Sequence, residues 1–370
     1  MQRWNVFGLL MVVISAGAYP LRAASFYVGN CKAGSFATIS AAIGAVPAGS
    51  TINVCPGTYA EQLIISKPLT LQAVVSSNTS QAIIAVPAGE LQTFPSIVFS
   101  PLAPQVEVSA GPVNLTGLIV DGTATSNCPS VHFVGIHYNS GSSGEVNGVE
   151  VRNHTCFGSA VSGPDVSIIA ENSAGPRQTV TIENSYIHET VFGGIISCSD
   201  QTPPTLSAEL RGNYIVTAKY GIAQICNTTG TIKGNFVEGE LYGIFVQGLS
   251  TISGNTVNDA AYAITTQAAS AVLRNTVNNA LIGISYSASG ASVLENKIVN
   301  SQQGISVGAA GGVVRRNLIT DTAVGIEFNC NTGAIAGNTI TSAMTAFDHV
   351  PGTLGGSNDT FNVATIRTGC

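Results

Sequence analysis

Charged side chains are scarce in this chain. Its 370 residues include 14 Lys and Arg and 20 Asp and Glu, so only 9% carry a formal charge and the net charge is −6. A typical globular domain carries about 25% charged residues. This shortage excludes a charged coiled coil, a nucleic-acid binder and a chain kept disordered by charge repulsion. We therefore expect no nucleic acid among its partners.

The most apolar stretch of the sequence is short and lies at the N-terminus. Arg3 precedes residues 6–18, which contain LLMVVI, and Ala16-Gly17-Ala18 gives a small-x-small cleavage pattern, with Ala23 as a second option. These are the parts of a secretory signal, and the stretch is too short for a membrane span. We predict a signal peptide over 1–24. The mature chain, 25–370, is then secreted, periplasmic or at the cell surface, with no membrane span.

Metal-binding motifs are also missing. No CxxC is present, no His lies at a zinc-finger spacing from a Cys pair, and three Met and five scattered His make no copper-type cluster. We therefore expect no metal and no cofactor. Eight cysteines, an even number in an exported chain, indicate disulfides instead. They are Cys31, Cys55, Cys128, Cys156, Cys198, Cys226, Cys330 and Cys370.

What the chain does have is an internal repeat of about 21 residues. Each copy has an Asn followed closely by Ile or Val, and roughly nine residues later a small residue followed by an apolar one. The Asn residues are Asn213, Asn235, Asn255, Asn275, Asn296, Asn317 and Asn338, and looser copies begin at Asn153 and Asn184. The later pairs are Gly221-Ile222, Gly243-Ile244, Ala263-Ile264, Gly283-Ile284, Gly304-Ile305, Gly325-Ile326 and Ala346-Phe347.

Within each copy, short β-prone runs alternate with turn residues, and no run reaches helical length. Such a unit cannot bury its apolar side alone, but it can stack on a copy of itself. Leucine-rich repeats share this length, yet Leu is sparse here and the inward positions are Ile and Val. The repeat predicts an all-β fold, a single-stranded parallel β-helix of ten to twelve turns with regular repeats at about 180–350.

The repeated Asn has a structural interpretation. Asn tolerates the left-handed backbone region at a tight corner better than other non-glycine residues. Stacked Asn side chains can also hydrogen-bond along a solenoid. We therefore assign this column, and the Ile of each Gly-Ile pair, to the scaffold.

A different pattern opens the mature chain. Phe36, Ile39, Ile43 and Val46 have the spacing of an amphipathic helix. Strands are expected at 51–54, 63–65 and 69–71. A short helix at this place would cover the open end of the solenoid, whose strand edges otherwise invite aggregation. We assign the capping region to about 25–60.

Residues 37–73 carry a family resemblance. Their capping helix, the turn Pro56-Gly57-Thr58-Tyr59, Glu61 and the step Lys67-Pro68 resemble the opening of pectin-lyase-like β-helix proteins. That superfamily includes pectin methylesterases, pectate lyases, polygalacturonases and alginate epimerases. The resemblance implies a right-handed β-helix over most of 25–350. It implies no particular activity, because one fold hosts many functions.

The catalytic motifs of these enzymes are missing. The chain has no Asp-Asp pair and no Asn-Thr-Asp, whereas hydrolysis needs paired carboxylates. Its seven Asp form no dense calcium cluster of the kind that pectate-lyase-like elimination uses. The esterase and epimerase signatures are absent as well.

One region could still hold a site. The steps Asn153–Asn184 and Asn184–Asn213 exceed the later repeats by eight to ten residues, and the segments 162–178 and 198–209 have the composition of loops. Inserted loops on one side of a solenoid often bind ligands. On the 150–220 face we take His188 as the candidate general base and Glu189 as the second candidate. The candidate substrate-binding residues are His154, Asp200, Arg211 and Lys219.

Three functions remain open. The first is a carbohydrate-associated protein without catalysis. The second is a polysaccharide lyase, hydrolase or epimerase that acts on uronate glycans. The third is a structural or adhesive rod. In each case we expect a monomer, with polysaccharide as the partner in the first two.

The disulfide pairing gives a first prediction. Turns stack at about 4.8 Å, inside the roughly 4.4–6.8 Å that a disulfide accepts between Cα atoms. Cys198 and Cys226 lie five residues after Gly193 and Gly221, at equivalent positions of adjacent turns. Eight cysteines allow 105 pairings, and adjacency favours Cys31–Cys55, Cys128–Cys156, Cys198–Cys226 and Cys330–Cys370. Non-reducing peptide mapping tests this set, and a Cys198–Cys330 peptide would contradict the repeat register.

Overall fold

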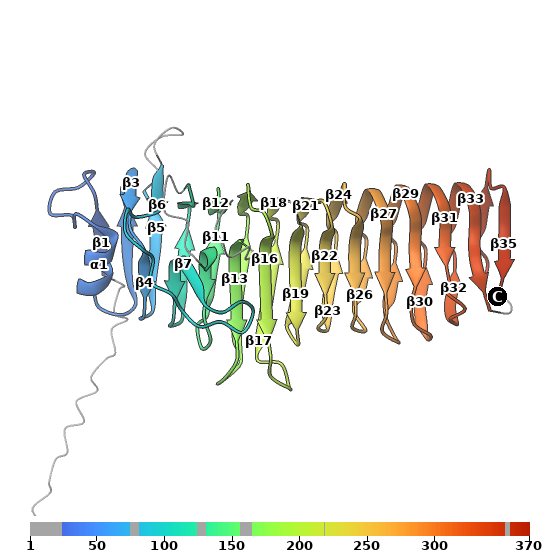
Figure 1. Ribbon diagram of the computed structural model, residues 1–370, viewed down its shortest axis with the longest axis horizontal. Coiled ribbons are helices and arrows are strands. Elements are labelled where there is room, and N and C mark those ends of the chain that lie inside the picture. Colours follow the sequence, from blue (N-terminus) through green and yellow to red (C-terminus); the bar gives the residue numbers. More distant parts are fainter. Residues whose placement is uncertain (1–23, 75–80, 124–130, 156–164, 218, 352–355) are drawn as a thin grey trace, which may run out of the picture.

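A long solenoid of stacked β-turns makes up the protein (Figure 1). The computed structural model describes residues 24–74, 81–123, 131–155, 165–217, 219–351 and 356–370. All strand pairings between successive turns are parallel, and each turn contributes a strand to the same two sheets. The fold is therefore the right-handed parallel β-helix that the repeat and the resemblance indicate.

Sheet A takes one strand from every turn. It has thirteen strands, slightly more than the ten to twelve turns expected, because two further turns lie within the region assigned to the cap. Its strands are β1 (Ser25–Val28), β2 (Ser50–Val54), β5 (Leu69–Ala73), β8 (Val113–Thr116), β11 (Gly144–Asn147), β14 (Gln178–Glu183), β17 (Leu206–Arg211), β20 (Thr229–Lys233), β23 (Ser250–Ser253), β26 (Ala271–Leu273), β28 (Ser292–Leu294), β30 (Gly312–Arg315) and β32 (Gly333–Ala336).

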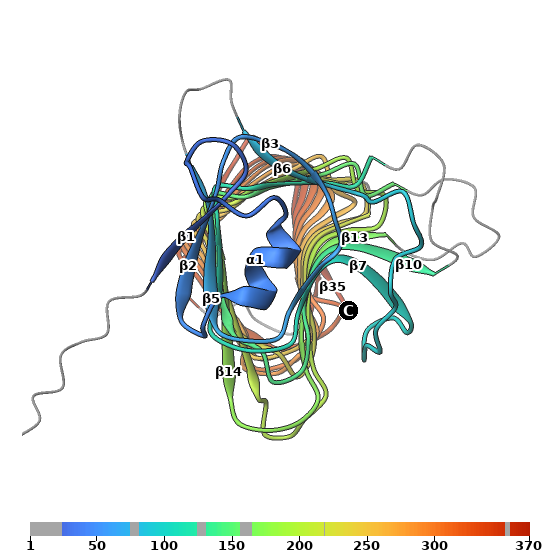
Figure 2. The same ribbon diagram turned by 90° about the vertical axis from the view of Figure 1, so that its left-hand side faces the viewer.

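Sheet B bends at a corner into two faces, so the cross-section is roughly triangular (Figure 2). Its first face follows sheet A in each turn and comprises β3 (Gly57–Ala60), β6 (Ala82–Ala85), β9 (Ile119–Asp121), β12 (Glu150–Arg152), β15 (Tyr186–His188), β18 (Tyr214–Thr217), β21 (Phe236–Gly239), β24 (Thr256–Asn258) and β34 (Asp359–Phe361).

The second face continues each turn back toward sheet A. Its strands are β4 (Leu63–Ile65), β7 (Leu102–Val108), β10 (His132–Tyr138), β13 (Val166–Asn172), β16 (Gly193–Ser199), β19 (Tyr220–Cys226), β22 (Tyr242–Val246), β25 (Tyr262–Thr266) and β35 (Thr365–Gly369). Four longer strands run through both faces: β27 (Thr276–Tyr286), β29 (Lys297–Val307), β31 (Leu318–Glu327) and β33 (Thr339–Val350).

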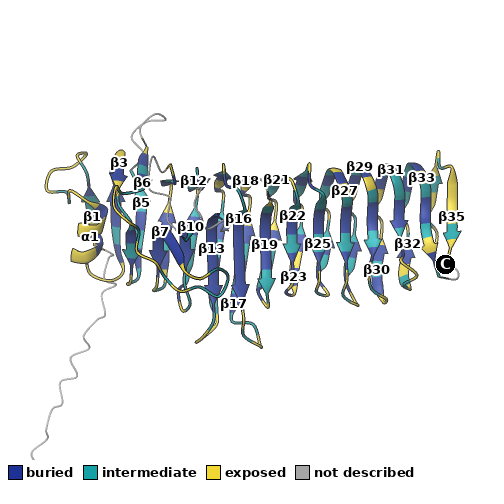
Figure 3. Cartoon of the chain, viewed as in Figure 1, coloured by how far each residue is buried: buried dark blue, intermediate teal, exposed yellow. Residues whose placement is uncertain are grey.

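The core is a set of apolar columns along the axis. Equivalent residues of successive turns are in register, so the Ile of each Gly-Ile pair stacks on the next, as Ile222, Ile244 and Ile264 do. These side chains are fully buried, and Figure 3 shows the buried positions recurring from turn to turn. Burying an Ile contributes about 1.5–3 kcal/mol, so the column stabilises every turn it crosses.

The repeated Asn forms a buried ladder. From Asn213 to Asn338, each side-chain Nδ2 donates to the Oδ1 of the next Asn at 2.9 or 3.0 Å. The backbone N–H donates to the same Oδ1, and Nδ2 also donates to a carbonyl of the preceding turn. Asn358 extends the series. The predicted hydrogen bonding along the solenoid is confirmed.

The predicted left-handed conformation of these Asn residues is wrong. The residue before each one has the positive φ, as in Gly212 at 61° and Gly254 at 63°, and the Asn itself points into the core. The two upstream copies are also out of register. Ser185, not Asn184, donates its N–H to Asn213 Oδ1, and Asn153 lies at the corner between the two faces of sheet B.

Helix α1 (Ile39–Ala45) caps the first turn, as predicted. Thr38 is its N-cap, and the Glu61 carboxylate accepts hydrogen bonds from the N–H groups of Ile39 and Ser40, both at 2.9 Å. At the other end, Lys67 Nζ donates to the carbonyls of Gly44 and Val46. An anion at the N-terminus and a cation at the C-terminus both stabilise a helix. The Glu61 and Lys67 of the resemblance therefore fix the cap.

Three predicted disulfides are present among the described residues: Cys31–Cys55, Cys198–Cys226 and Cys330–Cys370. Cys128 and Cys156 lie outside the described residues. The Cys198–Cys226 pair is not at equivalent positions, because Cys198 is in register with Ile225 and Ser199 with Cys226. Their Cα atoms are nevertheless 5.3 Å apart, since a one-residue offset between adjacent strands stays within disulfide reach.

The predicted signal peptide, 1–24, falls almost wholly outside the described residues. In the part of the chain that is described, no helix combines the length and the apolar character needed to cross a bilayer.

We predict that Asn275→Ala destabilises the protein by about 3 kcal/mol, because it removes two donors and leaves the buried N–H of Asn255 without its acceptor. The matched control is Asn278→Ala, which removes one hydrogen bond to Asn258 at a partly exposed strand position. It should cost under about 1 kcal/mol. Urea denaturation measures both. Equal losses would mean that the ladder does not hold the turns.

Candidate functional site

The candidate catalytic residues lie in a charged cluster on the first face of sheet B. Arg152 on β12 binds Asp121 on β9 (NH2 to Oδ2, 2.9 Å) and Glu150 beside it (NH1 to Oε1, 2.6 Å). His188 on β15 extends this row of charged contacts, with Nε2 at 3.3 Å from Glu150 Oε1 and Nδ1 at 3.4 Å from Glu189 Oε2. Stacking of β15 on β12 therefore brings His188 to Glu150, while Glu189 is its neighbour in the chain.

Asp121 anchors this cluster as a stable anion. Burial alone would raise the pKa of its carboxyl group. Hydrogen bonds from Thr123, Asn153 and Arg152 outweigh burial and lower the pKa to about 2. Asp121 and Arg152 thus form a permanently charged pair that positions Glu150.

Both ring nitrogens and one face of the His188 imidazole have partners. Each ring nitrogen faces a carboxylate, and the Tyr186 ring stacks on the imidazole with a centroid distance of 4.1 Å. A general base needs a free nitrogen within hydrogen-bond reach of the substrate proton. The arrangement favours a positioning or structural role over proton abstraction.

Glu189 occupies a corner that repeats along the solenoid. Its φ is 54°, and the equivalent corner residues of other turns include Asn153, Asp259, Asn279 and Asn300 with φ between 54° and 59°. Asn and Asp suit this left-handed position, which explains why they recur there. Glu189 and Asp259 at these corners therefore have a structural explanation, which is the left-handed turn that each residue makes.

The four predicted substrate-binding residues are dispersed. His154 is fully buried against Phe133, with Nε2 at 3.3 Å from Gln105 Oε1, and burial lowers its pKa to about 3. It is therefore a neutral core residue and does not reach the outer surface. Asp200 lies in the loop between β16 and β17, and Arg211 pairs with Glu209 on sheet A. Lys219 lies over the Phe192 ring at 5.0 Å.

Among the described residues of the two predicted loop segments, 166–172 form β13 and 206–209 belong to β17. The connections between sheet B and sheet A in these segments are residues 173–177 and 200–205. These connections protrude at the lower edge in Figure 1. They leave the solenoid at a different corner from His188 and Glu189, so they build no wall beside the charged cluster.

A strap, residues 94–101, covers the outer surface of the second face (Figure 2). Phe99 and Val98 pack against a satellite core of Leu102, Val134, Val166, Ile169, Ile196 and Ala223. Strands β7, β13 and β16 are consequently buried along their whole length. Near-continuous apolar runs such as VSIIA and GGIIS indicate two-sided burial, and this signal could have located the covered face.

Beneath the strap lies a buried charged triad that sequence reasoning missed. His137 Nδ1 is 2.7 Å from Glu107 Oε2, and its Nε2 is 3.3 Å from Glu171 Oε1. Glu171 Oε2 accepts hydrogen bonds from Ser96 Oγ and Ile97 N of the strap. Burial alone would lower the pKa of His137, but Glu107 and Glu171 outweigh it and raise the pKa to about 9. The triad therefore ties the strap to the solenoid.

Aromatic rings form a row on the second face beyond the strap. Tyr220, Tyr242 and Tyr262 stack at 5.1 and 5.0 Å between centroids, and Phe245 packs against the first two from the outer surface. The row leads into an open hollow of about 410 Å³. The hollow is lined by Tyr262, Leu281, Ile282, Gln302, Gln303, Ala323, Val324, Glu327 and Asp348.

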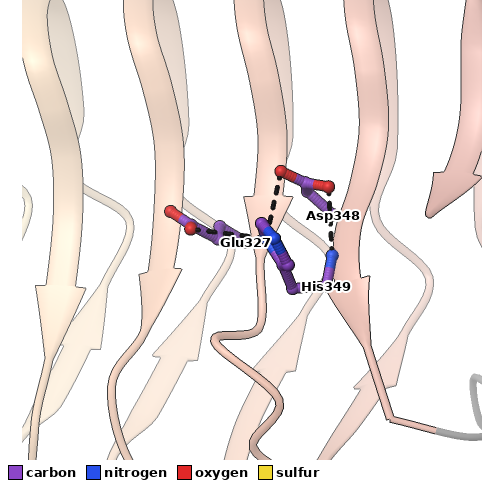
Figure 4. Close-up of side chains that lie close together, drawn as sticks. All are labelled: Glu327, Asp348 and His349. Atoms are coloured by element: carbon purple, nitrogen blue, oxygen red, sulfur yellow. Dashed lines mark hydrogen bonds and ion pairs between the residues drawn. The ribbon is translucent and has the colours of Figure 1, made fainter. Parts of the chain in front are cut away.

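At the far side of the hollow, Glu327, Asp348 and His349 lie close together (Figure 4). His349 Nδ1 is 3.3 Å from Asp348 Oδ2 and 3.7 Å from Glu327 Oε1. Sequence reasoning did not predict this group, although the repeat period of 21 residues separates Glu327 from Asp348 and places them in register.

Solved structures of carbohydrate-active enzymes are similar to this chain. A PL6 alginate lyase, solved with a trisaccharide, aligns with a TM-score of 0.52 at 11% identity, over 94% of this chain and 86% of its own. The GH87 α-1,3-glucanase catalytic unit of Streptomyces thermodiastaticus strain HF3-3 gives 0.48 at 13%, over 96% and 70%. The mannuronan C-5 epimerase AlgE4 A-module of Azotobacter vinelandii gives 0.46 at 14%, over 89% and 90%.

At these identities the likeness shows the fold alone: a right-handed parallel β-helix of the pectin-lyase-like type. A sequence family described as "Periplasmic copper-binding protein (NosD)" matches residues 180–353, which span the regular turns. No curated protein sequence matches the chain.

The description of that family raises the question of a copper site. Copper(I) prefers thiolate and thioether ligands. Within the described part of 180–353, Cys198, Cys226 and Cys330 are in disulfides, and Met344, the one described methionine, is 69% exposed. These residues do not fit a sulfur-ligated copper(I) site.

The triad predicts a pH dependence of stability. Because the folded-state pKa of His137 is raised to about 9, its contribution is complete below about pH 6.5 and is lost as the pH rises through 9. The loss should be about 3 kcal/mol. Urea midpoints between pH 6 and 9.5 measure it. His349→Gln should keep this profile and His137→Gln should flatten it, and a flat wild-type profile would contradict the assignment.

Proposed function

We propose that this chain is an exported carbohydrate-binding β-helix protein that holds a glycan along its axis without cleaving it. The observation that carries the proposal is the continuous surface formed by the tyrosine row, Tyr220, Tyr242 and Tyr262, and the hollow that follows it.

The row has the periodicity of the sheet. Its rings repeat at 5.1 and 5.0 Å because each tyrosine stands at the same position of successive turns, spaced at about 4.8 Å. Burial and the neighbouring tyrosines Tyr220 and Tyr262 raise the pKa of Tyr242. The Tyr242 phenol therefore remains a neutral donor at physiological pH. A sugar polymer lying along the axis offers hydroxyl groups in a comparable repeat.

The hollow adds the mixed chemistry of a sugar site. Tyr262, Ile282 and Val324 supply an apolar surface for the C–H face of a sugar ring, while Gln302 and Gln303 supply amide donors and acceptors. Binding sites for small ligands combine such an apolar lining with a few polar groups. Glu327 and Asp348 make this end of the surface acidic, and the whole chain carries a charge of −6. A neutral glycan therefore suits the surface better than a polyuronate.

Binding is favoured over catalysis by the state of the candidate residues. Both nitrogens of His188 face carboxylates, and His154 is buried. Among the described residues, the first candidate base of the 150–220 face therefore has no nitrogen free for a substrate, which argues against the lyase, hydrolase and epimerase functions there. A structural or adhesive rod remains as the outcome if no glycan is bound.

We predict that Tyr242→Ala weakens glycan binding about tenfold, because it removes packing and a hydrogen bond worth about 1.4 kcal/mol. The matched control is Phe361→Ala, which removes an exposed aromatic ring from the first face near the last turn. The binding assay uses the mature protein with neutral α- and β-glucans, alginate and polygalacturonate, and measures affinity by calorimetry.

The same incubations should show no new double bonds and no new reducing ends. Turnover that disappears in the double variant His188→Ala, Glu189→Ala would replace the binding proposal with the enzymatic one. Retention of none of the polymers would favour the rod. Equal losses in Tyr242→Ala and Phe361→Ala would remove the tyrosine row from the proposal.

A further inference from the structure

We infer that Glu327, Asp348 and His349 form a binding site for a divalent first-row transition metal of the Zn²⁺ or Cu²⁺ type. The site lies at the end of β31 and β33, at the edge of the hollow (Figure 4). It is independent of glycan binding, since it rests on the three side chains themselves.

The spacing of the ligand atoms suits a shared ion. One atom from each residue lies within 4.8 Å of the other two, and His349 Nδ1 is 3.3 Å from Asp348 Oδ2 and 3.7 Å from Glu327 Oε1. Metal–ligand bonds of about 2.0–2.2 Å place the ligands of a tetrahedral ion roughly 3.3–3.6 Å apart. Direct N–H···O bonds are shorter, about 2.7–3.2 Å. His349 Nδ1 thus lies from both carboxylates at separations close to those between ligands of one ion and longer than a usual hydrogen bond.

The backbone holds the three residues in place. Glu327 and Asp348 are neighbours in the β31–β33 register. A register irregularity between Phe347 and Val350 shifts the end of β33 against β35, and His349 there has a φ of 48°. Such bulges re-aim a side chain next to functional sites. The His349 N–H donates to Thr368 Oγ1, and the Cys330 N–H donates to the His349 carbonyl, beside the Cys330–Cys370 disulfide.

The charge of the group is unbalanced. Among the described residues, neither Glu327 nor Asp348 has a Lys or Arg within ion-pair distance, and His349 is the basic side chain they share. A divalent cation would neutralise both carboxylates. Both also line the hollow of about 410 Å³, which leaves room for water or an exogenous ligand at an open coordination position.

The imidazole of His349 determines which metals the site should prefer. Nitrogen with carboxylate oxygens suits Zn²⁺ and Cu²⁺, whereas Ca²⁺ and Mg²⁺ prefer all-oxygen shells. His188 supplies a contrast within the same molecule. It also lies between two carboxylates, but it faces them through opposite nitrogens, Nε2 toward Glu150 and Nδ1 toward Glu189. One ion cannot bind all three groups there.

The test uses the tag-free mature protein after chelator treatment, titrated separately with Zn²⁺, Cu²⁺ and Ca²⁺ in a calorimeter. We expect one Zn²⁺ or Cu²⁺ per chain and at least tenfold weaker binding of Ca²⁺. His349→Ala and Glu327→Gln should each weaken binding at least tenfold, while His188→Ala should not change it. Electron paramagnetic resonance of the Cu²⁺ form should show coupling to one imidazole nitrogen that His349→Ala removes.

Thermal unfolding without metal checks that each variant is folded. The proposal fails if neither Zn²⁺ nor Cu²⁺ binds saturably, or if binding survives in both His349→Ala and Glu327→Gln. It also fails if His188→Ala weakens binding as much as His349→Ala does. Glycan binding by the metal-free protein, measured in parallel, separates failure of this site from failure of the carbohydrate proposal.

Discussion

Parallel pairing of each turn with the next, in register, is the constraint on which the rest of this structure depends. Because equivalent residues stack at the inter-strand spacing, one good side-chain contact can be repeated along the axis. Ile stacks on Ile in the core, and Asn bonds to Asn in the buried ladder. Tyr stacks on Tyr at the surface. The ladder enforces the register, because a slip of one residue at Asn255 would leave buried amides and N–H groups without partners.

The same constraint explains what the sequence could predict. A period of about 21 residues was enough for the solenoid, since the spacing of Asn and Gly-Ile pairs reports stacking directly. The capping helix followed from local periodicity, and three disulfides followed from adjacency. Errors arose where one residue matters. Asn184 and Asn213 look equivalent in the sequence, because Asn is favoured both at a left-handed corner and in the buried ladder. In the structure Asn184 is at the left-handed corner and Ser185 occupies the ladder position.

The candidate site was predictable only in part. His188 and Glu189 do meet Glu150 and Arg152, because neighbouring turns bring them together. His154 looked like a surface residue and is buried, because Gln105 on β7 and Phe133 on β10 pack against it. The Glu107–His137–Glu171 triad was missed because the strap that binds Glu171 comes from a distant part of the chain. No periodic signal links Glu107 and Glu171 to Ser96, and the burial of their charges depends on that non-local contact.

The positions of the disulfides bear on how such an array comes apart. In a one-dimensional stack, a terminal turn has a single neighbour and opens at the lowest free energy, so unfolding normally begins by fraying from an end. Here Cys31–Cys55 ties the first strand of sheet A to the second, and Cys330–Cys370 spans the last turns. Both fraying ends are covalently closed. Opening must then start at an interior turn, where two interfaces break together, and the solenoid gains kinetic persistence that its individual turns do not have.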